Sequence, residues 1–465
     1  MPIESTERTP SVERARRARV EPYLFLVVEG GRLDAGGLRV ALGGVETLQI
    51  GRCQARVLQR PSASEASLGV PDVRMSSVHA RIVRRDGTYR VEDLNSTNGT
   101  LVNGSAITTP TALHHDDLVE LGQTLFTYRE IEEDTVGRAM DLDLSTAPAV
   151  QPGMRTLDPN IACRLERLAR VAPALLSILL LGETGTGKEV LARDLHVLSM
   201  RPGPFVAVNC GAIPGNLVEA HLFGYVRGAF SGAVRDEQGM VRAANFGTLL
   251  LDEIGDLPMS SQAALLRVLQ EGEVVPVGST KTVKVDVRVI AATHMPINDL
   301  VEQGSFRRDL YARLAGYSFS VPPLRERKVD LGLLIAALFA AGKVDSPASV
   351  RLHRESARAM MRHDWPMNVR ELEQCLRAAC VLAQDGIVTV ADLPSALALA
   401  PGAPEQTADA VLDGRDEELR RELLVRIVDA RGNVTEVARA MGKARQQVQR
   451  WLRRFQIDPE AYRDT

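Results

Sequence analysis

Cysteine is scarce in this sequence, and the cysteines that are present stand far apart. Among 465 residues there are five, and none belongs to a Cys-x-x-Cys pair: Cys53, Cys163, Cys210, Cys375 and Cys380. Zinc sites and redox motifs need closely spaced ligands, and small disulfide scaffolds need many more cysteines. The pattern indicates buried free thiols in a reducing compartment and argues against a disulfide framework or a metal site.

Long apolar runs and a strong net charge are also absent. The most apolar stretches, 174–181 and 331–341, fall far short of the roughly 20 residues that a membrane-spanning helix needs. Residues 1–20 lack an apolar core, so we expect a disordered polar tail and no secretory signal. The net charge is −3, so any contact with nucleic acid must come from a local basic patch. We expect a cytoplasmic protein with no membrane segment.

A glycine-rich loop follows a short apolar run near the middle of the chain. The stretch Ile178–Glu189 reads ILLLGETGTGKE, which predicts a buried strand, a tight loop and the start of a helix. In such a loop, backbone N–H groups turn toward one anion, and the helix N-terminus and a lysine add positive potential. The alternative is a plain turn between strand and helix. We predict a nucleotide site formed by Gly182, Glu183, Thr184, Gly185, Thr186, Gly187, Lys188 and Glu189.

Apolar strand patterns alternate with helical segments after this loop, at 205–208, 248–251 and 285–291. The alternation predicts an α/β sheet of the nucleotide-hydrolase type. The second of these strands ends in Asp252 and Glu253. Because phosphoryl transfer needs mainly positioning and charge, Asp252 is suited to hold Mg²⁺ through water, and Glu253 is suited to orient the attacking water.

Short alternating runs separated by Gly, Asn and Asp turns fill residues 21–131 and predict an antiparallel all-β sandwich. Three clusters, Gly51-Arg52, MSSVHARI (75–82) and DLNSTNGTLVNG (93–104), resemble the forkhead-associated (FHA) domain, a phosphothreonine-peptide reader. A guanidinium pairs a phosphate dianion in a forked geometry, which agrees with this resemblance; the alternative for the arginine is a surface salt bridge. The resemblance implies a peptide site made of Arg52, Ser76, Thr97 and Asn98, with His79 bracing the loops.

One departure from the FHA pattern bears on affinity. Ser77 stands where the family often has a second basic residue, so we expect the affinity for phosphopeptide to be modest.

Residues 160–395 resemble the AAA+ domain of bacterial sigma-54-dependent transcription activators. The resemblance rests on GETGTGKE, PFVAVNC, LFGYVRGAFSGA, GTLLLDEIGDLP, LLRVLQEGE, RVIAATH, FRRDLYARL, PPLRERKVD and WPMNVRELE. It implies ATP and Mg²⁺ as cofactors and a closed homo-oligomeric ring, typically a hexamer, since arginines act in the neighbouring subunit's site. The alternative for each arginine is a helix-surface ion pair. The implied roles are restraint of Glu253 by Asn209, γ-phosphate sensing by Thr293, fingers in trans by Arg307 and Arg313, and phosphate contact from the lid by Arg370.

The same resemblance also implies which protein the ATPase acts on. A phenylalanine flanked by glycines in an insertion forms an exposed apolar tip, which is costly to leave in water; the alternative is a phenylalanine packed into the core. In the family this loop contacts the sigma factor, and here it consists of Gly228, Ala229, Phe230, Ser231, Gly232 and Ala233. Three positions depart from the usual family residues, namely Ser231 for Thr, His294 for Asn and Met367 for Gly.

Three helical stretches, 417–430, 434–441 and 444–455, close the chain and predict a helix-turn-helix. The segment GNVTEVARAMGKARQQVQRWLRRF (432–455) resembles the Fis-type helix-turn-helix that closes this activator family, although Lys443 occupies a usually apolar turn position. We expect an inward face of Val448, Trp451, Leu452 and Phe455. Arg and Gln read base edges; the alternative is a solvated basic helix in a bundle. We predict base contacts from Arg445, Gln447, Gln449 and Arg450, and phosphate contacts from Arg453 and Arg454.

The features together predict a multidomain chain with an all-β sandwich, an α/β P-loop ATPase with a helical lid, and an all-α helix-turn-helix. The expected boundaries are a disordered tail at 1–20, the FHA domain at 21–131, a linker at 132–158, the α/β subdomain at 159–323, the lid at 324–397, a second linker at 398–414 and the DNA reader at 415–465.

The favoured hypothesis is an ATP-dependent activator that binds upstream double-stranded DNA and remodels sigma-54 RNA polymerase to open promoters. Its FHA domain would dock on a threonine-phosphorylated protein; no aspartate-phosphorylated receiver pattern is evident. The alternative is a phosphopeptide-controlled DNA-binding AAA+ switch that acts on a different client. A further alternative is that Thr6 or Thr9 of the tail is itself the phosphothreonine ligand.

Overall fold

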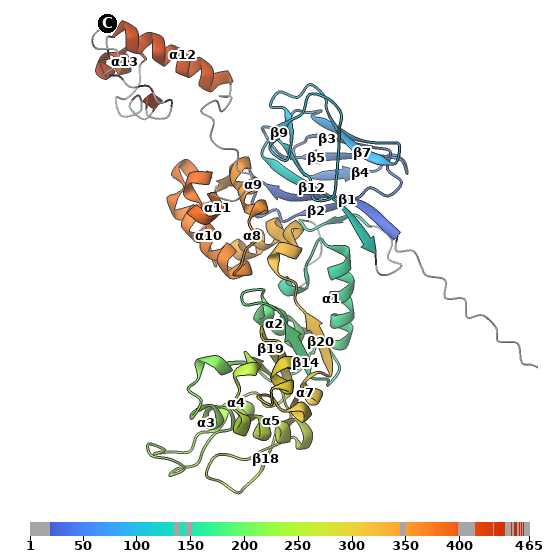
Figure 1. The fold of residues 1–465 in the computed structure, drawn as a ribbon, viewed down its shortest axis with the longest axis vertical. Helices are drawn as coiled ribbons and strands as arrows, with labels where there is room; N and C mark the ends of the chain where they lie inside the picture. The colour runs from blue at the N-terminus through green and yellow to red at the C-terminus, as the bar shows by residue number, and fades with distance from the viewer. Residues whose placement is uncertain are drawn as a thin grey trace, which may run out of the picture. The chain divides into compact units, whose positions relative to one another are not determined.

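A computed structural model describes residues 19–133, 140–145, 151–344, 350–398, 414–430, 432–441 and positions 448, 451, 452, 455, 457 and 459. The chain divides into two compact units, Met1–Ala400 and Pro401–Thr465. The first unit contains a β-sandwich, an α/β subdomain and a helical subdomain, coloured blue, green to yellow, and orange in Figure 1. The predicted fold class is confirmed.

Two sheets face each other in the sandwich and enclose an apolar core that includes Leu26, Leu48 and Phe126. The larger sheet has the strand order β13-β2-β1-β12-β11-β8-β9, and the smaller has β10-β7-β6-β3-β5-β4. The strands are β1 Arg19–Glu29, β2 Leu38–Ala41, β3 Thr47–Arg52, β4 Val57–Gln59, β5 Glu65–Val70, β6 Ala80–Arg85, β7 Thr88–Asp93, β8 Thr100–Val102, β9 Ser105–Ala106, β10 Thr111–Ala112, β11 Leu118–Leu121, β12 Thr124–Glu133 and β13 Leu142–Asp143.

One pair of strands in the sandwich runs parallel. β3 pairs with β5 in parallel register from Thr47–Glu65 to Arg52–Val70, whereas β4 pairs with β5 antiparallel. The chain reverses direction twice between β3 and β5, so β5 returns in the direction of β3. The prediction of an entirely antiparallel sandwich is therefore wrong at this pair.

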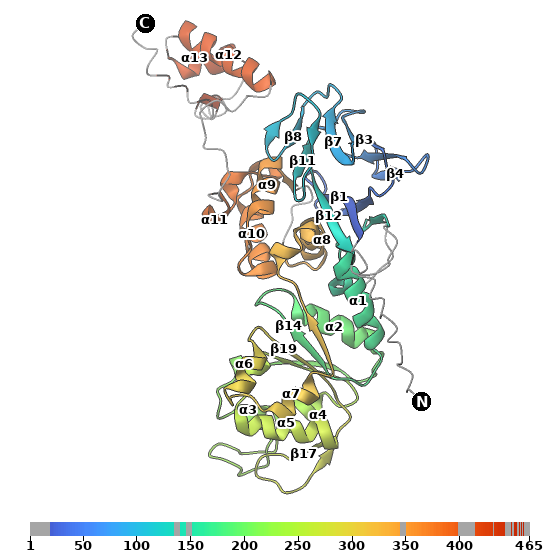
Figure 2. The same cartoon turned by 45° about the vertical axis from the view of Figure 1, so that its right-hand side comes forward.

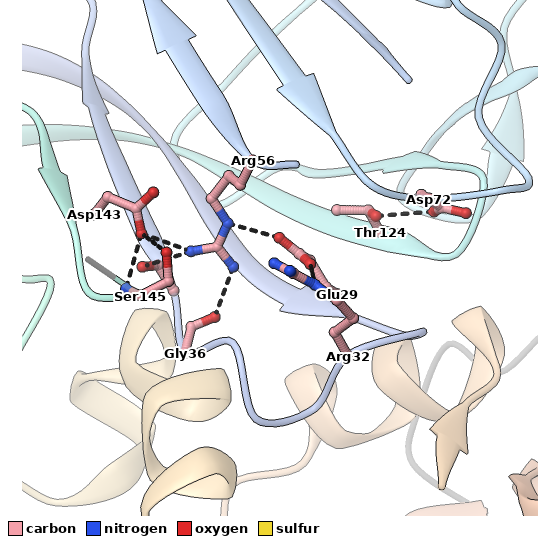
Figure 3. A network of polar contacts seen from close by, with 9 residues as sticks. Glu29, Arg32, Gly36, Arg56, Asp72, Thr124, Asp143 and Ser145 are labelled. Atoms are coloured by element: carbon pink, nitrogen blue, oxygen red, sulfur yellow. Dashed lines mark hydrogen bonds and ion pairs between the residues drawn. The ribbon is translucent and has the colours of Figure 1, made fainter. Parts of the chain in front are cut away.

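The segment after the sandwich adds a strand to its larger sheet. β13 pairs with β2, and the side chain of Arg56, 2% exposed, donates to Glu29 at 2.6 Å and to Asp143 at 2.9 Å. Figure 3 shows the guanidinium between the two carboxylates. A buried arginine needs such partners, because an unpaired buried charge costs several kcal/mol. Residues 140–145 thus belong with the sandwich, although we predicted them to be linker.

A five-stranded parallel sheet with the order β15-β16-β19-β14-β20 forms the centre of the α/β subdomain (Figure 2). Leu179 of β14 faces the cluster on α5, and Leu180 faces the cluster on α1 and α2, so the run is apolar on both faces. The elements are η1 Pro152–Met154, α1 Pro159–Val171, β14 Ile178–Leu181, α2 Lys188–Leu198, β15 Phe205–Asn209, η2 Cys210–Ala212, α3 Val218–Phe223, α4 Gly239–Ala243, β16 Thr248–Asp252, η3 Ile254–Asp256, α5 Met259–Glu271, β17 Glu273–Val274, β18 Val283–Lys284, β19 Arg288–Thr293, α6 Ile297–Glu302, α7 Arg308–Leu314 and β20 Tyr317–Ser320.

The helical subdomain, called the lid below, packs around Trp365 and Leu372. The same apolar cluster continues onto the outer face of the sandwich, where it includes Tyr23, Phe25 and Val27 of β1. The lid elements are η4 Leu324–Glu326, η5 Lys328–Asp330, α8 Leu331–Ala340, β21 Arg351–Leu352, α9 Arg354–Arg362, α10 Asn368–Leu382, η6 Gln384–Gly386, β22 Ile387–Val388, η7 Val390–Asp392 and α11 Ser395–Ala398.

In the second unit, α12 Gly414–Asp429 packs Leu423 and Ile427 against Val437 of α13 Val434–Ala440. The side chain of Asn433 caps α13 by accepting the Thr435 N–H at 3.1 Å. Of the predicted inward face, Val448, Leu452 and Phe455 are buried in the same cluster and Trp451 is half-buried against it.

The cysteines are all free, but they are not all buried. Cys210, Cys375 and Cys380 lie in apolar cores, and burial raises the pKa of the Cys210 thiol to about 12. Cys53 is exposed and Cys163 half-buried, so the prediction of buried thiols is wrong for Cys53. Across the described ranges, no helix is both long enough and apolar enough to span a membrane.

Candidate functional sites

The carboxyl ends of four parallel strands meet at one edge of the α/β sheet. Leu181 of β14 lies beside Thr293 at the end of β19, and Asn209 at the end of β15 lies beside Asp252 at the end of β16. In open parallel sheets this edge is where ligands bind. The structure thus brings the predicted loop, acids and sensor to one place.

The glycine loop between β14 and α2 has a backbone that requires glycine. Gly185 and Gly187 have φ angles of 79° and 98°. A Cβ at Gly185 would lie 2.3 Å from the Met367 carbonyl oxygen of the lid. The loop therefore turns tightly, and its N–H groups precede the N-terminus of α2, which is an arrangement suited to phosphate.

Lys188 lies at the first position of α2, and its side chain is folded back under the loop. Its Nζ donates to the carbonyls of Gly182 at 2.8 Å and Glu183 at 3.1 Å. Burial lowers the pKa of Lys188, and the nearby carboxylates of Glu253 and Asp252 oppose that shift. Lys188, Asp252 and Glu253 therefore form one electrostatic group.

The lid holds the loop through side chains that we did not predict. Arg325 donates to both carboxylate oxygens of Glu183, at 2.5 and 2.9 Å, and the Asn368 amide donates to Glu183 and to the Thr184 carbonyl at 3.1 Å. The hydrogen bonds from Arg325 and Asn368 lower the pKa of Glu183 to about 2. The motif PPLRERKVD contains Arg325, but nothing in that motif alone pairs it with the loop.

Asp252 offers one oxygen to a cation. Its Oδ1 is buried and has no hydrogen-bond partner within the described structure, and burial raises the pKa of this carboxyl. A buried unpartnered carboxylate oxygen beside a phosphate loop fits a Mg²⁺ ion or one of its waters. The described residues contain no cluster of three or more His, Cys, Asp or Glu suited to a metal.

Glu253 has a left-handed backbone with φ of 52°, and its Oε2 lies 2.7 Å from Nδ1 of His294. The side chain of Asn209 instead accepts the Ala212 N–H at 3.1 Å. Thr293 is fully buried and its hydroxyl accepts the Met295 N–H at 3.0 Å. In this structure the side chain of Glu253 contacts His294, and the role predicted for Asn209 stays a prediction.

The arginines predicted to act in a neighbouring subunit are exposed. Arg307 precedes α7 and pairs with Asp309 at 2.7 Å, and Arg313 lies in the last turn of the same helix. Arg370 lies in the first turn of α10, with its Cβ 3.1 Å from a Cβ built on Gly185. Arg370 is therefore beside the loop of its own chain, and the other two are available to another chain.

The predicted contact loop closes on itself and presents its aromatic side chain. The Gly228 N–H donates to the Ala233 carbonyl at 2.9 Å, and Gly228 and Gly232 have φ angles of 82° and 104°. Phe230 is 38% exposed and meets Tyr225 edge-on at 4.9 Å between ring centroids. The core-packed alternative for this phenylalanine does not hold, since the ring lies at the surface on a single aromatic neighbour.

The four residues predicted to bind phosphopeptide lie on adjacent loops of the sandwich. The Thr97 N–H donates to the Ser76 hydroxyl at 3.0 Å, and the Asn98 amide donates to the Arg74 carbonyl at 2.6 Å. The Arg52 N–H donates to the Ser76 carbonyl at 2.8 Å, and the Arg52 side chain is exposed, with one contact to Val73 at 3.5 Å. The four predicted residues thus lie close together with the Arg52 guanidinium toward solvent, and their role in peptide binding stays a prediction.

His79 links two of these loops from inside. Its Nδ1 accepts the Ser76 N–H at 3.0 Å, and its Nε2 lies 3.2 Å from the Gly99 carbonyl. These partners require a neutral ring protonated on Nε2. Burial lowers the pKa of His79, which keeps the ring neutral.

The six residues predicted to contact DNA, at positions 445, 447, 449, 450, 453 and 454, lie outside the described residues. Their assignment stays a prediction.

Family models match four segments of the chain. They are described as Sigma-54 interaction domain at residues 154–320, AAA+ ATPase lid domain at 325–410, FHA domain at 49–122 and Homeodomain-like domain at 415–460. The matched segments correspond to the four parts described above.

Individual relatives match either the whole chain or its centre. The transcriptional regulatory protein GlrR of Escherichia coli is 33% identical over 455 residues, which is 95% of this chain and 99% of that protein. The acetoin catabolism regulatory protein of Cupriavidus necator is 42% identical over 318 residues, 66% of this chain and 47% of its own length. The chain thus spans about half the length of the acetoin regulators that it matches. A crystal structure of NtrX from Brucella abortus is 29% identical in sequence to this chain, with a TM-score of 0.47. The match covers 65% of this chain and 69% of the NtrX chain.

Proposed function

The chain belongs to the sigma-54-dependent transcriptional activators, with an FHA domain and an AAA+ ATPase domain, and from that membership we propose that it hydrolyses ATP to remodel sigma-54 RNA polymerase and open promoters. The observation that carries the proposal is the grouping of Lys188, Asp252 and Glu253 at one edge of the sheet, in the subdomain that exposes Phe230. The proposed ATPase site and the proposed sigma-factor contact loop thus lie in the same α/β subdomain.

The residues at the sheet edge divide the work of phosphoryl transfer. Loop N–H groups and Lys188 hold the phosphates, and Lys188 must leave the carbonyls of Gly182 and Glu183 to do so. Asp252 would hold Mg²⁺, which supplies charge neutralisation on the phosphate oxygens. Glu253 orients the attacking water, and Thr293, at the end of the adjacent strand, reports the presence of the γ-phosphate.

Completion of the site requires a second copy of the chain. Arg307 directly precedes α7 with its side chain 38% exposed, and Arg313 is exposed in the last turn of that helix. A guanidinium supplied in trans stabilises the charge that develops on the transferred phosphoryl group. A contact of this kind is heterologous, and repeated heterologous contacts close into a ring. We propose a hexamer as the working state, with Arg370 contacting the phosphates from the lid.

The other two domains would regulate the ATPase and direct the protein to its DNA site. Arg52, Ser76, Thr97 and Asn98 would bind phosphothreonine on a partner protein, with the exposed guanidinium pairing the dianion. The second unit would bind upstream DNA through its last helix. These two assignments rest on the FHA and homeodomain-like matches and on the geometry of the peptide loops.

The exposed Phe230 provides the decisive experiment. In Phe230→Ala, transcription from a reconstituted sigma-54 promoter should fall to background, because the exposed apolar tip is removed. The rate of ATP turnover should stay at the wild-type value, because this tip lies outside the nucleotide site. Leu217→Ala, which removes another exposed apolar side chain from the same subdomain, serves as the control. Unchanged transcription in the Phe230 variant would reject sigma-54 as the client and favour an AAA+ switch that acts on another protein.

A further inference from the structure

The loop that follows β19 lies against the turn that carries Glu253. A Cβ at Gly255 would come within 2.7 Å of the Met295 sulfur and 3.4 Å of the Thr293 hydroxyl, so the two segments pack without a gap. The hydrogen bond from Met295 N–H to the Thr293 hydroxyl fixes the turn after the strand. The position of His294 between these two residues is therefore set by packing rather than by its own side chain.

His294 holds one oxygen of Glu253. Nδ1 lies 2.7 Å from Oε2, and the His294 N–H approaches the same oxygen at 3.4 Å. The carboxylate is only 16% exposed, so the bond is partly shielded from water. With Oε2 engaged as acceptor, the other oxygen is left to align a water molecule.

We propose that His294 is the positioning residue of Glu253, in place of the contact expected from Asn209. This inference rests on the proposed ATPase role of Glu253. The requirement is for a donor at this distance, so an asparagine amide can substitute and an alanine methyl cannot.

The test compares steady-state ATP turnover of the full chain for the wild type, His294→Ala and His294→Asn. We expect kcat to fall by about ten-fold or more in the alanine variant, with KM and the affinity for a fluorescent ATP analogue unchanged, and to recover in the asparagine variant. Adding His294→Ala to Glu253→Gln should cause no further loss, because the two residues act as a unit. His221→Ala, an exposed histidine on the same subdomain, is the control.

An alanine variant with wild-type kcat, or a loss that the asparagine variant does not rescue, would overturn the inference. A wild-type chain that hydrolyses no ATP would instead reject the proposed function, so the two failures are distinguishable.

A second, independent observation concerns the contact between the FHA domain and the lid, which we call the FHA–lid contact. Tyr23, Phe25 and Val27 on the outer face of β1 share one apolar cluster with Leu331 and Ile335 of α8. All five side chains are at most 1% exposed. The sandwich and the lid therefore share a single apolar core rather than a wet surface contact.

Polar groups fix the register of this contact. Arg358 of α9 makes a two-pronged pair with Glu120 of β11 at 2.6 and 2.7 Å, and both side chains are at least 91% buried. The Leu352 N–H of the lid donates to the Gly30 carbonyl at 2.7 Å. Double hydrogen bonding of a buried arginine allows one arrangement and penalises others.

A glycine in the lid helix is needed for the two parts to approach. A Cβ on Gly332 of α8 would lie 1.8 Å from the Val27 carbonyl oxygen, and its other close atoms also belong to the sandwich. Gly332 is the second residue of α8, and its presence there is explained by the close approach of β1.

Hydrogen bonds connect this contact to the predicted phosphopeptide loops. Asn98 binds the carbonyl of Arg74, whose N–H binds Asp72, and the other Asp72 oxygen accepts from Gln123 at 2.7 Å. The Gln123 carbonyl accepts the Gly30 N–H at 3.1 Å, and Gly30 accepts from the lid. The recognition loop and the lid are thus joined through consecutive bonded groups.

The geometry points to an autoinhibitory role for the FHA–lid contact: the FHA domain restrains the lid, which must move for Arg370 and the loop to cycle with nucleotide. This inference about the FHA–lid contact also rests on the proposed ATPase function. Because the restraint and the peptide site share bonded residues, a ligand at the peptide site would act on the lid through differential contact with the docked state.

Gly332→Ala provides a selective test, since the three atoms nearest to the added methyl group all belong to the sandwich. We expect ATP turnover of the full chain to rise about five-fold or more, together with faster hydrogen exchange in β1 and α8. Gly31→Ala, whose Cβ would meet no atom within 4 Å, should change neither quantity. Unchanged or lower turnover, with β1 and α8 exchanging faster, would overturn the inference.

The ion pair gives a second variant in case Gly332→Ala perturbs the lid. Glu120→Arg should raise turnover, and addition of Arg358→Glu should return it toward the wild-type value, because the reversed pair can form again. A double variant as active as the single variant would contradict a restraint made by this pair. Absence of turnover in the wild type would reject the ATPase role and not the contact.

Discussion

Two sites for phosphate are built in opposite ways in this chain. In the AAA+ domain, the cation that would meet phosphate is 94% buried and bound to two carbonyls of its own loop. In the FHA domain, the Arg52 guanidinium lies in solvent, the Ser76 hydroxyl accepts the Thr97 N–H, and the Asn98 amide donates to the Arg74 carbonyl. One site is a backbone cradle inside the fold, whereas the other is a set of side chains on loops.

This difference determines how much binding each site loses when a single group is removed. The backbone N–H groups are preorganised, and the buried lysine needs only to exchange its two carbonyl partners for phosphate. None of these groups can be replaced singly, since the loop and the lid close around them. Exposed side chains each contribute a separable part of the binding free energy and are screened by salt. The predictions below test this contrast, from the largest expected effect to the smallest.

Removal of the buried cation should have the largest effect. Lys188→Ala is expected to lower kcat/KM for ATP by about 100-fold or more, because it removes the cation held beneath the loop. Steady-state ATPase assays and binding of a fluorescent ATP analogue measure the loss. Arg193→Ala, on the exposed face of the same helix, controls for the loss of a positive charge. A Lys188 variant with near-normal turnover would refute the preorganised cradle.

Removal of the exposed guanidinium should cost less. Arg52→Ala is expected to weaken binding of a phosphothreonine peptide by about 1.5–3 kcal/mol, which is the range for hydrogen bonds to charged groups. Calorimetry on the full chain, with the unphosphorylated peptide alongside, gives the value, and the loss should shrink at high salt. Arg85→Ala is the matched control, since it removes the same charge from an exposed strand end. Equal losses in both variants would indicate a general charge effect and no site.

The smallest effect should come from pH, acting through His79. Burial places its folded pKa below the unfolded value of 6.5. The unfolded state therefore binds more protons at acid pH, and the stabilisation present above pH 6.5 is lost as the pH falls toward the folded pKa. Hydrogen exchange of residues 75–99, corrected for intrinsic rates, should show less protection at about pH 5 than at about pH 7.

His79→Gln keeps polar groups at this position but cannot titrate. Its protection should be lower than that of the wild type and nearly independent of pH over the same range. The same change at the exposed His114 should leave the pH dependence in place. A wild-type dependence that survives in the His79 variant would assign the effect to another group.

Much of the fold could be predicted from the sequence because each part carries its own local pattern. The run ILLLGETGTGKE specifies strand, loop and helix: β14 covers its four apolar residues, and α2 begins at its lysine. The alternation around residues 80–83 and 89–91 specifies strands with one covered face, and β6 and β7 have that form. Such patterns depend on neighbours in sequence, which is why they could be identified without the structure.

What could not be predicted depends on contacts between distant segments. Tyr23–Val28 is apolar at every position, which is unusual for a sandwich strand with one wet face. That run was the available signal that the lid covers the outer face of β1. Neither spacing nor composition predicts the pairing of His294 with Glu253, of Arg325 with Glu183, or of Asp143 with Arg56. Each pair joins two segments that are far apart in the sequence, and no periodic pattern connects such segments.

Gly332 has a consequence for how such proteins can be assembled from parts. An FHA sandwich fused to a lid that carries a side chain at this position would meet that lid in some other pose, because the Val27 carbonyl occupies the space of a methyl group. Sensor and motor in this chain are therefore exchangeable only as a matched pair. A chimera that receives only the sandwich of this chain should retain both ligand sites and lose the coupling between them.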